Sequence, residues 1–156
     1  MMINVFIDGA SRGNPGFSSC AFVMMNEKEI IEEKGFYLGK ITNNQAEYSG
    51  LLMGLLAAKE KHLETIQIMS DSELLVKQLE GQYRVKSPNL LSYFELYSCA
   101  KSWFSTLSVE HIPREENTRA DRLCNLILNQ NKGKEIEKEV SLDTIRELYK
   151  RNTRRS

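Results

Sequence analysis

The stretch from Val5 to Gly16, VFIDGASRGNPG, most constrains how this chain can fold. Its apolar run predicts a short buried strand over Ile3–Asp8, and Asp8 carries the first charge after that run. A carboxylate at the end of a buried strand is costly to desolvate unless a partner compensates it. A metal ion is one such partner. A solvated turn acid is the plainer alternative, because Asp-Gly is common in turns. This stretch alone leaves both interpretations open.

Length and composition bound the class of protein. The 156 residues suit one domain, and a hydrophobic content of 41% can fill one core. Basic and acidic residues number 21 each, so any nucleic-acid contact would be a local patch. The three cysteines fit neither a disulfide framework nor a zinc spacing, which favours a reducing compartment. The chain shows no basic leader and no apolar stretch long enough for a bilayer, so we expect no membrane association and a cytoplasmic location.

The order of apolar runs and turn residues predicts an α/β domain with a mixed sheet. We expect strands at 3–8, 18–26, 29–38, 65–70 and 107–112, and helices at about 43–60, 72–79, 88–104 and 118–128. Small residues recur along the first of these helices, including Gly50 and Gly54. This helix should therefore lie close against the sheet.

The end of the chain differs from the rest. Residues 129–133 are typical of a linker, and Ser141 is placed to cap a last helix from Leu142 to about Arg151. The last seven residues carry four basic side chains and no acid. A frayed, solvated tail is the plainer interpretation of them, and a weak nucleic-acid arm is the functional one. We expect residues 131–156 to be a basic C-terminal extension with one short helix.

Four acidic residues stand at similar places in the predicted elements. Asp8 and Asp71 end strands, whereas Glu47 and Asp121 lie in the first turns of helices. Ligands bind at the carboxyl ends of strands in α/β sheets, where these acids could meet. Clustered carboxylates repel one another unless a cation lies among them, and oxygen ligands without His or Cys suit Mg²⁺ or Mn²⁺. Any one of these acids alone is more often an ordinary turn or helix acid, but the four together favour a metal site.

Four segments, in order, resemble the ribonuclease H type 1 family: FIDGASRGNPG, TNNQAEYSGLLMGL, SDSELLVKQLEG and HIPREENTRADRL. The resemblance covers about residues 2–129 and implies a ribonuclease H-like five-stranded mixed sheet flanked by helices, with residues 1–130 as the catalytic domain. It also implies metal-dependent, endonucleolytic cleavage of the RNA strand of an RNA–DNA hybrid, leaving 5′-phosphate and 3′-hydroxyl ends. Two metal ions about 3.5–4 Å apart would carry out this hydrolysis. The cofactor would be Mg²⁺, with Mn²⁺ as a substitute, and the metal ligands would be Asp8, Glu47, Asp71 and Asp121.

The same resemblance implies substrate contacts. Asn14, Asn43, Asn44 and Gln45 would read both strands across the minor groove and sense the 2′-hydroxyls that distinguish RNA from DNA. A role for Asn43 and Asn44 as plain helix caps is an equal alternative, and Arg12 either touches a phosphate or is solvated. The partner would be an RNA–DNA hybrid, with double-stranded RNA as a further candidate, and we expect a monomer.

Two departures place the chain near a shorter branch of the family. Many members have a basic helical protrusion where this chain has GQYRVKSPNL, with only Arg84 and Lys86. Many also have a mobile histidine in a glycine-rich loop before the last acid. Here His111 is typical of a strand-end residue, and Arg114 lies in the loop. Asn117 is typical of a helix cap, with an active-site contact as the less favoured alternative. An arginine is always charged and is no general base, but it can stabilise charge that develops on a phosphate.

Two other functions stay open. A fold-mate such as an exonuclease or a polynucleotidyl transferase would show a different acid spacing or further DNA-binding domains. A binding module for hybrids or double-stranded RNA that has lost catalysis would have no need to cluster negative charge where phosphates approach. Cleavage of a labelled hybrid with Mg²⁺ or Mn²⁺, and none with chelator, separates the enzyme from the module.

We predict that Arg114→Ala lowers turnover on a hybrid more than His111→Ala does. The reason is that a loop guanidinium can stabilise phosphate charge, whereas a strand-end histidine has a structural role. Cleavage rates of the two variants and the unaltered protein, measured on one labelled hybrid, check this order. The opposite order would overturn the assignment of Arg114.

Overall fold

A five-stranded sheet forms the centre of the computed structural model, which describes residues 2–131 and 139–154. Its strands are β1 (Ile3–Arg12), β2 (Gly16–Asn26), β3 (Glu29–Ile41), β4 (Thr65–Ser70) and β5 (Thr106–His111), in the spatial order β3-β2-β1-β4-β5. β1 pairs antiparallel with β2 and parallel with β4; β2 and β3 are antiparallel, and β4 and β5 parallel. The predicted five-stranded mixed sheet is confirmed.

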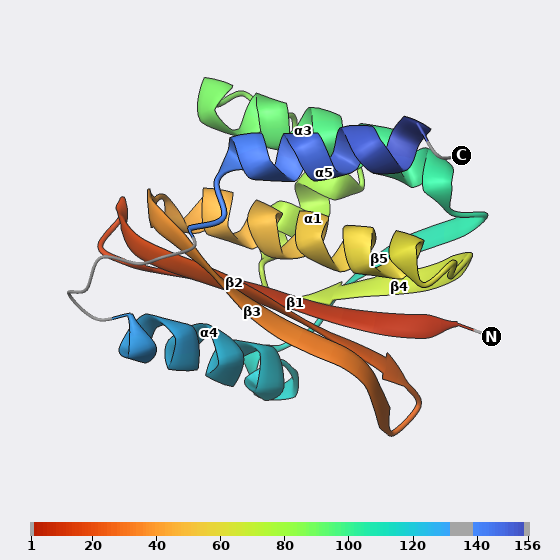
Figure 1. Ribbon diagram of the computed structural model, residues 1–156, viewed down its shortest axis with the longest axis horizontal. Coiled ribbons are helices and arrows are strands. Elements are labelled where there is room, and N and C mark those ends of the chain that lie inside the picture. The colour runs from red at the N-terminus through yellow and green to blue at the C-terminus, as the bar shows by residue number, and fades with distance from the viewer. Residues whose placement is uncertain (1, 132–138, 155–156) are drawn as a thin grey trace.

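Helices cover both faces of this sheet (Figure 1). One face carries α1 (Asn43–Glu60), with α3 (Pro88–Ala100) and α5 (Leu142–Arg154) packed over it, and the other carries α4 (Thr118–Gln130). The short helix α2 (Glu73–Leu79) contacts β4 and β5. Single 3₁₀ turns occupy Lys101–Trp103 and Arg114–Glu116, where the sequence predicted helix and loop. Among the described residues, no helix has both the length and the apolar character to cross a membrane.

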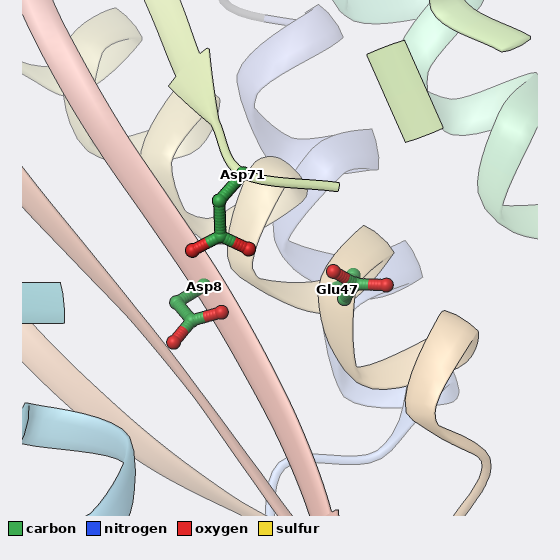
Figure 2. A group of neighbouring side chains, drawn as sticks. All are labelled: Asp8, Glu47 and Asp71. Atoms are coloured by element: carbon green, nitrogen blue, oxygen red, sulfur yellow. The ribbon is translucent and has the colours of Figure 1, made fainter. Parts of the chain in front are cut away.

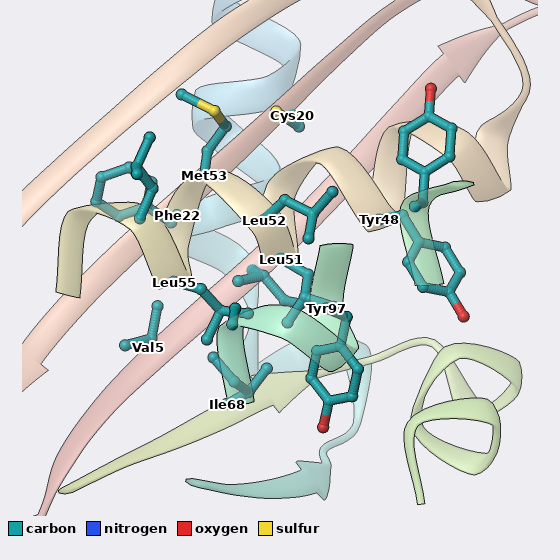
Figure 3. Close-up of a cluster of buried hydrophobic side chains, with 14 of the residues drawn as sticks. Val5, Cys20, Phe22, Tyr48, Leu51, Leu52, Met53, Leu55, Ile68 and Tyr97 are labelled. Carbon is teal, nitrogen blue, oxygen red and sulfur yellow. The ribbon is translucent and has the colours of Figure 1, made fainter. Parts of the chain in front are cut away.

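The central helix of the fold is α1. It begins with a capping box, in which the Thr42 hydroxyl accepts from the Gln45 amide and the Gln45 side chain accepts from the Thr42 amide. The interpretation of Asn43 and Asn44 as caps is therefore wrong. From Ala46 to Ala58 every residue of α1 is buried, because the sheet lies on one side and α3 and α5 on the other. Figure 3 shows its leucines within this core.

Close contact between α1 and β1 requires two glycines. A Cβ on Gly50 would lie 2.7 Å from the carbonyl oxygen of Asp8, and one on Gly9 would collide with the backbone of Ala46 and Glu47. Real Cβ atoms do not come this close to backbone atoms, so only glycine fits at these two crossings. The predicted close packing of the first helix is confirmed, and it fixes the spacing between Asp8 and Glu47.

The end of β1 differs from the prediction. We expected the strand to end at Asp8, but it continues to Arg12, because Gly9–Arg12 pair antiparallel with Phe17–Cys20 of β2. Gly9 accommodates α1 instead of forming a turn. The parallel pairing of β1 with β4 nevertheless stops at Ile7 and Ser70. Asp8 and Asp71 are therefore the first residues beyond the last parallel pair.

The C-terminal segment packs onto the main core. Val140 donates its amide to the Tyr37 carbonyl at the edge of the sheet, 2.9 Å away, before α5 begins. On α5, Ile145 and Tyr149 are fully buried, and the Tyr149 hydroxyl donates to the Leu52 carbonyl of α1. The predicted last helix is confirmed, and the interpretation as a frayed tail is wrong as far as residue 154. Part of the predicted linker, residues 132–133, and the final two residues lie outside the described ranges.

We predict that Ile145→Ala lowers the free energy of unfolding by about 2–5 kcal/mol, because it leaves a cavity between α5 and α1. Arg151→Ala, at an exposed position of the same helix, is the matched control and should change stability by less than about 0.5 kcal/mol. Chemical denaturation of both variants measures the difference. Equal stabilities would contradict the assignment of α5 to the core.

Candidate metal centre

Three of the four predicted metal ligands meet beside the end of β4. Asp8 comes from β1, Glu47 from the second turn of α1 and Asp71 from the residue after β4. One carboxylate oxygen from each lies within 4.8 Å of the others. Figure 2 shows Asp8 and Asp71 next to each other, with Glu47 approaching from α1. Asp8 and Glu47 are buried, with 8% and 9% of their surface exposed, and Asp71 is half-buried.

Asp121 stands outside this cluster of three. It lies in the first turn of α4, on the other face of the sheet from α1, and is exposed. Its charge still contributes to raising the pKa of Asp8, so it faces the same region. The structure therefore gathers three acids tightly and places the fourth at the border of the site.

Burial and repulsion by neighbouring acids disfavour the charged forms of Asp8 and Glu47. Burial raises the pKa of Asp8 well above its ordinary value, and the charge of Asp71 raises it further. Burial and Asp71 also raise the pKa of Glu47 to about 7, against a hydrogen bond from Ser72 that lowers it. A cation held among the three groups would remove this penalty, because it favours their charged forms. The donor set, carboxylate oxygens alone, suits a hard divalent ion such as Mg²⁺.

The side chain that contacts this cluster most directly is Asn117. Its Nδ2 donates to the Ile7 carbonyl, at 2.9 Å, and to Asp71 Oδ2, at 3.0 Å. We interpreted this residue as a helix cap, but its side chain makes no capping hydrogen bond with α4. The sequence favoured the cap because an asparagine before a helix is normally one, and a contact with the site was the less favoured alternative.

The predicted substrate-binding residues lie around the start of α1. Asn14 Oδ1 accepts from the Asn43 amide at 3.0 Å, and Asn43 Nδ2 donates to Glu47 Oε1 at 3.3 Å. Asn44 is exposed beside them. The side chain of Gln45 belongs to the capping box and also donates to the Asn89 carbonyl at 3.5 Å. Two hydrogen bonds thus link Asn14 to Asn43 and Asn43 to Glu47.

Two arginines were also predicted to contact the substrate or the reacting phosphate, and both are exposed. Arg12 donates to Asn129 Oδ1 of α4 at 2.8 Å, so its guanidinium is directed to that helix. Arg114 begins the 3₁₀ turn that precedes α4. His111 ends β5, as expected, and its Nε2 lies 3.3 Å from the Asp71 carbonyl oxygen.

We predict that the metal-free protein loses stability as the pH rises from about 4.5 to about 7. The folded-state pKa of Glu47 lies above its ordinary value of 4.5, so the stabilising effect of its proton is complete at low pH and is lost as the pH passes about 7. The loss attributable to this residue is up to about 3 kcal/mol. Unfolding of the unaltered protein and of Glu47→Gln in chelator, across this range, isolates the effect. Parallel stability curves for the two proteins would contradict the prediction.

Comparison with known proteins places the chain among similar sequences. Residues 6–127 match the family described as "Reverse transcriptase-like". The Ribonuclease HI of Halobacterium salinarum is 37% identical over 128 residues, which are 81% of this chain and 64% of that protein. A bifunctional protein of Mycobacterium tuberculosis is 36% identical over 80% of this chain and 35% of its own length. The chain therefore spans less than two thirds of these relatives.

Solved structures match over a larger share of their length. The crystal structure of RNase H1 from Halobacterium salinarum superposes with a TM-score of 0.80 at 36% identity, covering 83% of this chain and 99% of that one. LC11-RNase H1, solved in complex with an RNA/DNA hybrid, has a TM-score of 0.78 at 34% identity and covers 82% and 97%. A shared fold at this identity, over more than four fifths of this chain and nearly all of the solved ones, shows that the chain belongs to the ribonuclease H type 1 family.

Proposed function

We propose that this protein is a metal-dependent endoribonuclease that hydrolyses the RNA strand of RNA–DNA hybrids and leaves 5′-phosphate and 3′-hydroxyl ends. The observation that carries the proposal is the cluster of Asp8, Glu47 and Asp71, whose oxygens lie within 4.8 Å of one another. A binding module has no use for such a concentration of negative charge where phosphates approach. The hybrid in the complex of LC11-RNase H1 supports the choice of substrate.

The cofactor we propose is Mg²⁺, with Mn²⁺ as a substitute. Asp8, Glu47 and Asp71 would hold it, with Asp121 completing the set from α4. When bound, two divalent ions activate a water molecule and stabilise the leaving oxygen of the phosphodiester. Asn43 and Ser72 orient the Glu47 carboxylate by hydrogen bonds, and Asn117 orients that of Asp71. Arg114 would stabilise negative charge on the scissile phosphate from the turn before α4.

Substrate recognition would use the polar start of α1. Asn43 and Asn44 lie about one helical turn before Glu47, and Asn14 contacts Asn43. A hybrid whose RNA strand meets the acids would pass beside these side chains. Short amide side chains both donate and accept hydrogen bonds, as recognition of a 2′-hydroxyl requires. The Gln45 side chain takes part in the capping box, which favours a structural role for this residue. The hydrogen bond from Arg12 to Asn129 favours a contact with α4 over one with the substrate.

Other parts of the proposal rest on the sequence. We propose a monomer in the cytoplasm, with double-stranded RNA as a second substrate to be tested. We also propose that residues 1–130 form the catalytic domain, with residues 131–156 as an extension. Because α5 packs on α1, this extension would support the helix that carries Glu47 instead of acting as a free arm.

We predict that Asp8→Asn and Asp71→Asn each lower the cleavage rate of a labelled hybrid in Mg²⁺ by at least about 100-fold, or about 2.7 kcal/mol of activation free energy. Each change removes a charge that holds the cation. Asp143→Asn, on the exposed side of α5, is the matched control and should cleave like the unaltered protein.

A melting curve in chelator distinguishes loss of activity through unfolding from loss of activity through the missing metal ligand. Asp8→Asn relieves repulsion among buried carboxylates, so its melting temperature should equal or exceed that of the unaltered protein. If the unaltered protein binds the hybrid but never cleaves it, in Mg²⁺ or in Mn²⁺, the binding-module function replaces the one proposed here.

A further inference from the structure

We infer that Asn117 is a positioning residue that joins Asp71, β1 and the start of α4 into one unit and thereby sets the geometry of the metal site. This inference deepens the proposed function and rests on it. It goes beyond the four acids because Asn117 carries no charge and would not ligate the metal.

Both hydrogens of the Asn117 amide nitrogen are used on the site. Nδ2 has two hydrogens, and its two acceptors are the Ile7 carbonyl and Asp71 Oδ2, at 2.9 and 3.0 Å. Ile7 immediately precedes Asp8, so this one group links the backbone beside the first acid to the carboxylate of another. The amide therefore restrains the orientation of the Asp71 carboxylate beside the cluster.

The backbone of Asn117 is hydrogen-bonded to that of the fourth acid, Asp121. Its carbonyl accepts from the Asp121 amide at 3.1 Å, in the first turn of α4. The side chain contacts Asp71 and the main chain contacts Asp121, so a shift of Asn117 would displace both. Because α4 lies on the opposite face of the sheet from α1, this residue couples the border acid to the buried cluster.

The arrangement leaves one polar atom of the Asn117 side chain without a partner among the described residues. Asn117 is only 1% exposed, and its Oδ1 has no hydrogen-bond partner among the described residues. A buried acceptor without a partner costs about 1–3 kcal/mol. As the residue before α4, Asn117 could instead use Oδ1 to cap the helix, which stabilises a helix by about 1 kcal/mol. The side chain makes no such capping bond, and its Nδ2 donates to Asp71 instead, as a role in the site requires.

The test measures Mg²⁺ binding to the free protein, without nucleic acid. We expect Asn117→Ala to weaken Mg²⁺ binding about 10- to 100-fold, the usual effect of removing a group that orients a metal ligand. Asn131→Ala is the matched control, because Asn131 donates to a carbonyl at the far end of the same helix, 2.7 Å away. A titration followed by NMR shifts of backbone amides around Asp8 and Asp71 gives both affinities.

A second variant keeps the test decisive if Asn117→Ala does not fold. Asn117→Ser retains a residue suited to cap α4 but lacks the amide, so the helix should stay stable while Mg²⁺ binding falls by the same factor. In hybrid cleavage, both variants should lower kcat and raise the Mg²⁺ concentration needed for half-maximal rate, with KM for the hybrid changed less than about two-fold.

The outcomes separate this inference from the proposed function. Mg²⁺ affinities of the Asn117 variants equal to that of Asn131→Ala would overturn it, as would the absence of any Mg²⁺-dependent shift in the unaltered protein. If the unaltered protein binds Mg²⁺ but cleaves no hybrid, the proposed nuclease function fails, and a selective loss of Mg²⁺ binding in the Asn117 variants still supports the inference.

Discussion

Three carboxylates held within 4.8 Å of one another, two of them buried, form the constraint on which the rest of the structure depends. Burial and the nearby charge of Asp71 favour the protonated forms of Asp8 and Glu47. Within the described residues, no salt bridge compensates them, and hydrogen bonds from Asn43, Ser72 and Asn117 only partly do so. The fold keeps the acids together by rigid packing, at a cost in stability that a bound cation would offset.

That rigidity comes from the way α1 lies on β1. Gly9 and Gly50 let the two backbones approach until a side chain on either glycine would collide, so the helix has no room to move toward the sheet. α3 and α5 cover its other side, and the bond from Tyr149 to Leu52 attaches the end of the chain to it. The positions of the acids are thus fixed by contacts between backbones, which are far stiffer than the side chains themselves.

Local patterns predicted most of the fold. Strand β4 and the start of α1 lie where the sequence predicted them, at residues 65–70 and 43. The errors occur where a partner strand or a packed neighbour overrides local preference. Gly9 was expected to end β1, yet pairing with β2 continues the strand to Arg12. The glycine instead leaves room for the backbone of α1, which passes close to it. The last residues were expected to fray because their basic side chains are visible in the sequence, whereas the packing of Ile145 and Tyr149 that holds α5 in place was not.

By itself, the sequence determined the identity of the acids, the kind of ion they suit and the order of the elements that carry them. It did so because charge, ligand chemistry and hydrophobic period are properties of the residues. Only the tertiary structure decided that Asp8, Glu47 and Asp71 form the tight group while Asp121 stands beside it, and that Asn117 bonds to Asp71 instead of capping α4. These are distances between segments remote in the chain, fixed by strand register and by the depth at which α1 and α4 pack on the sheet.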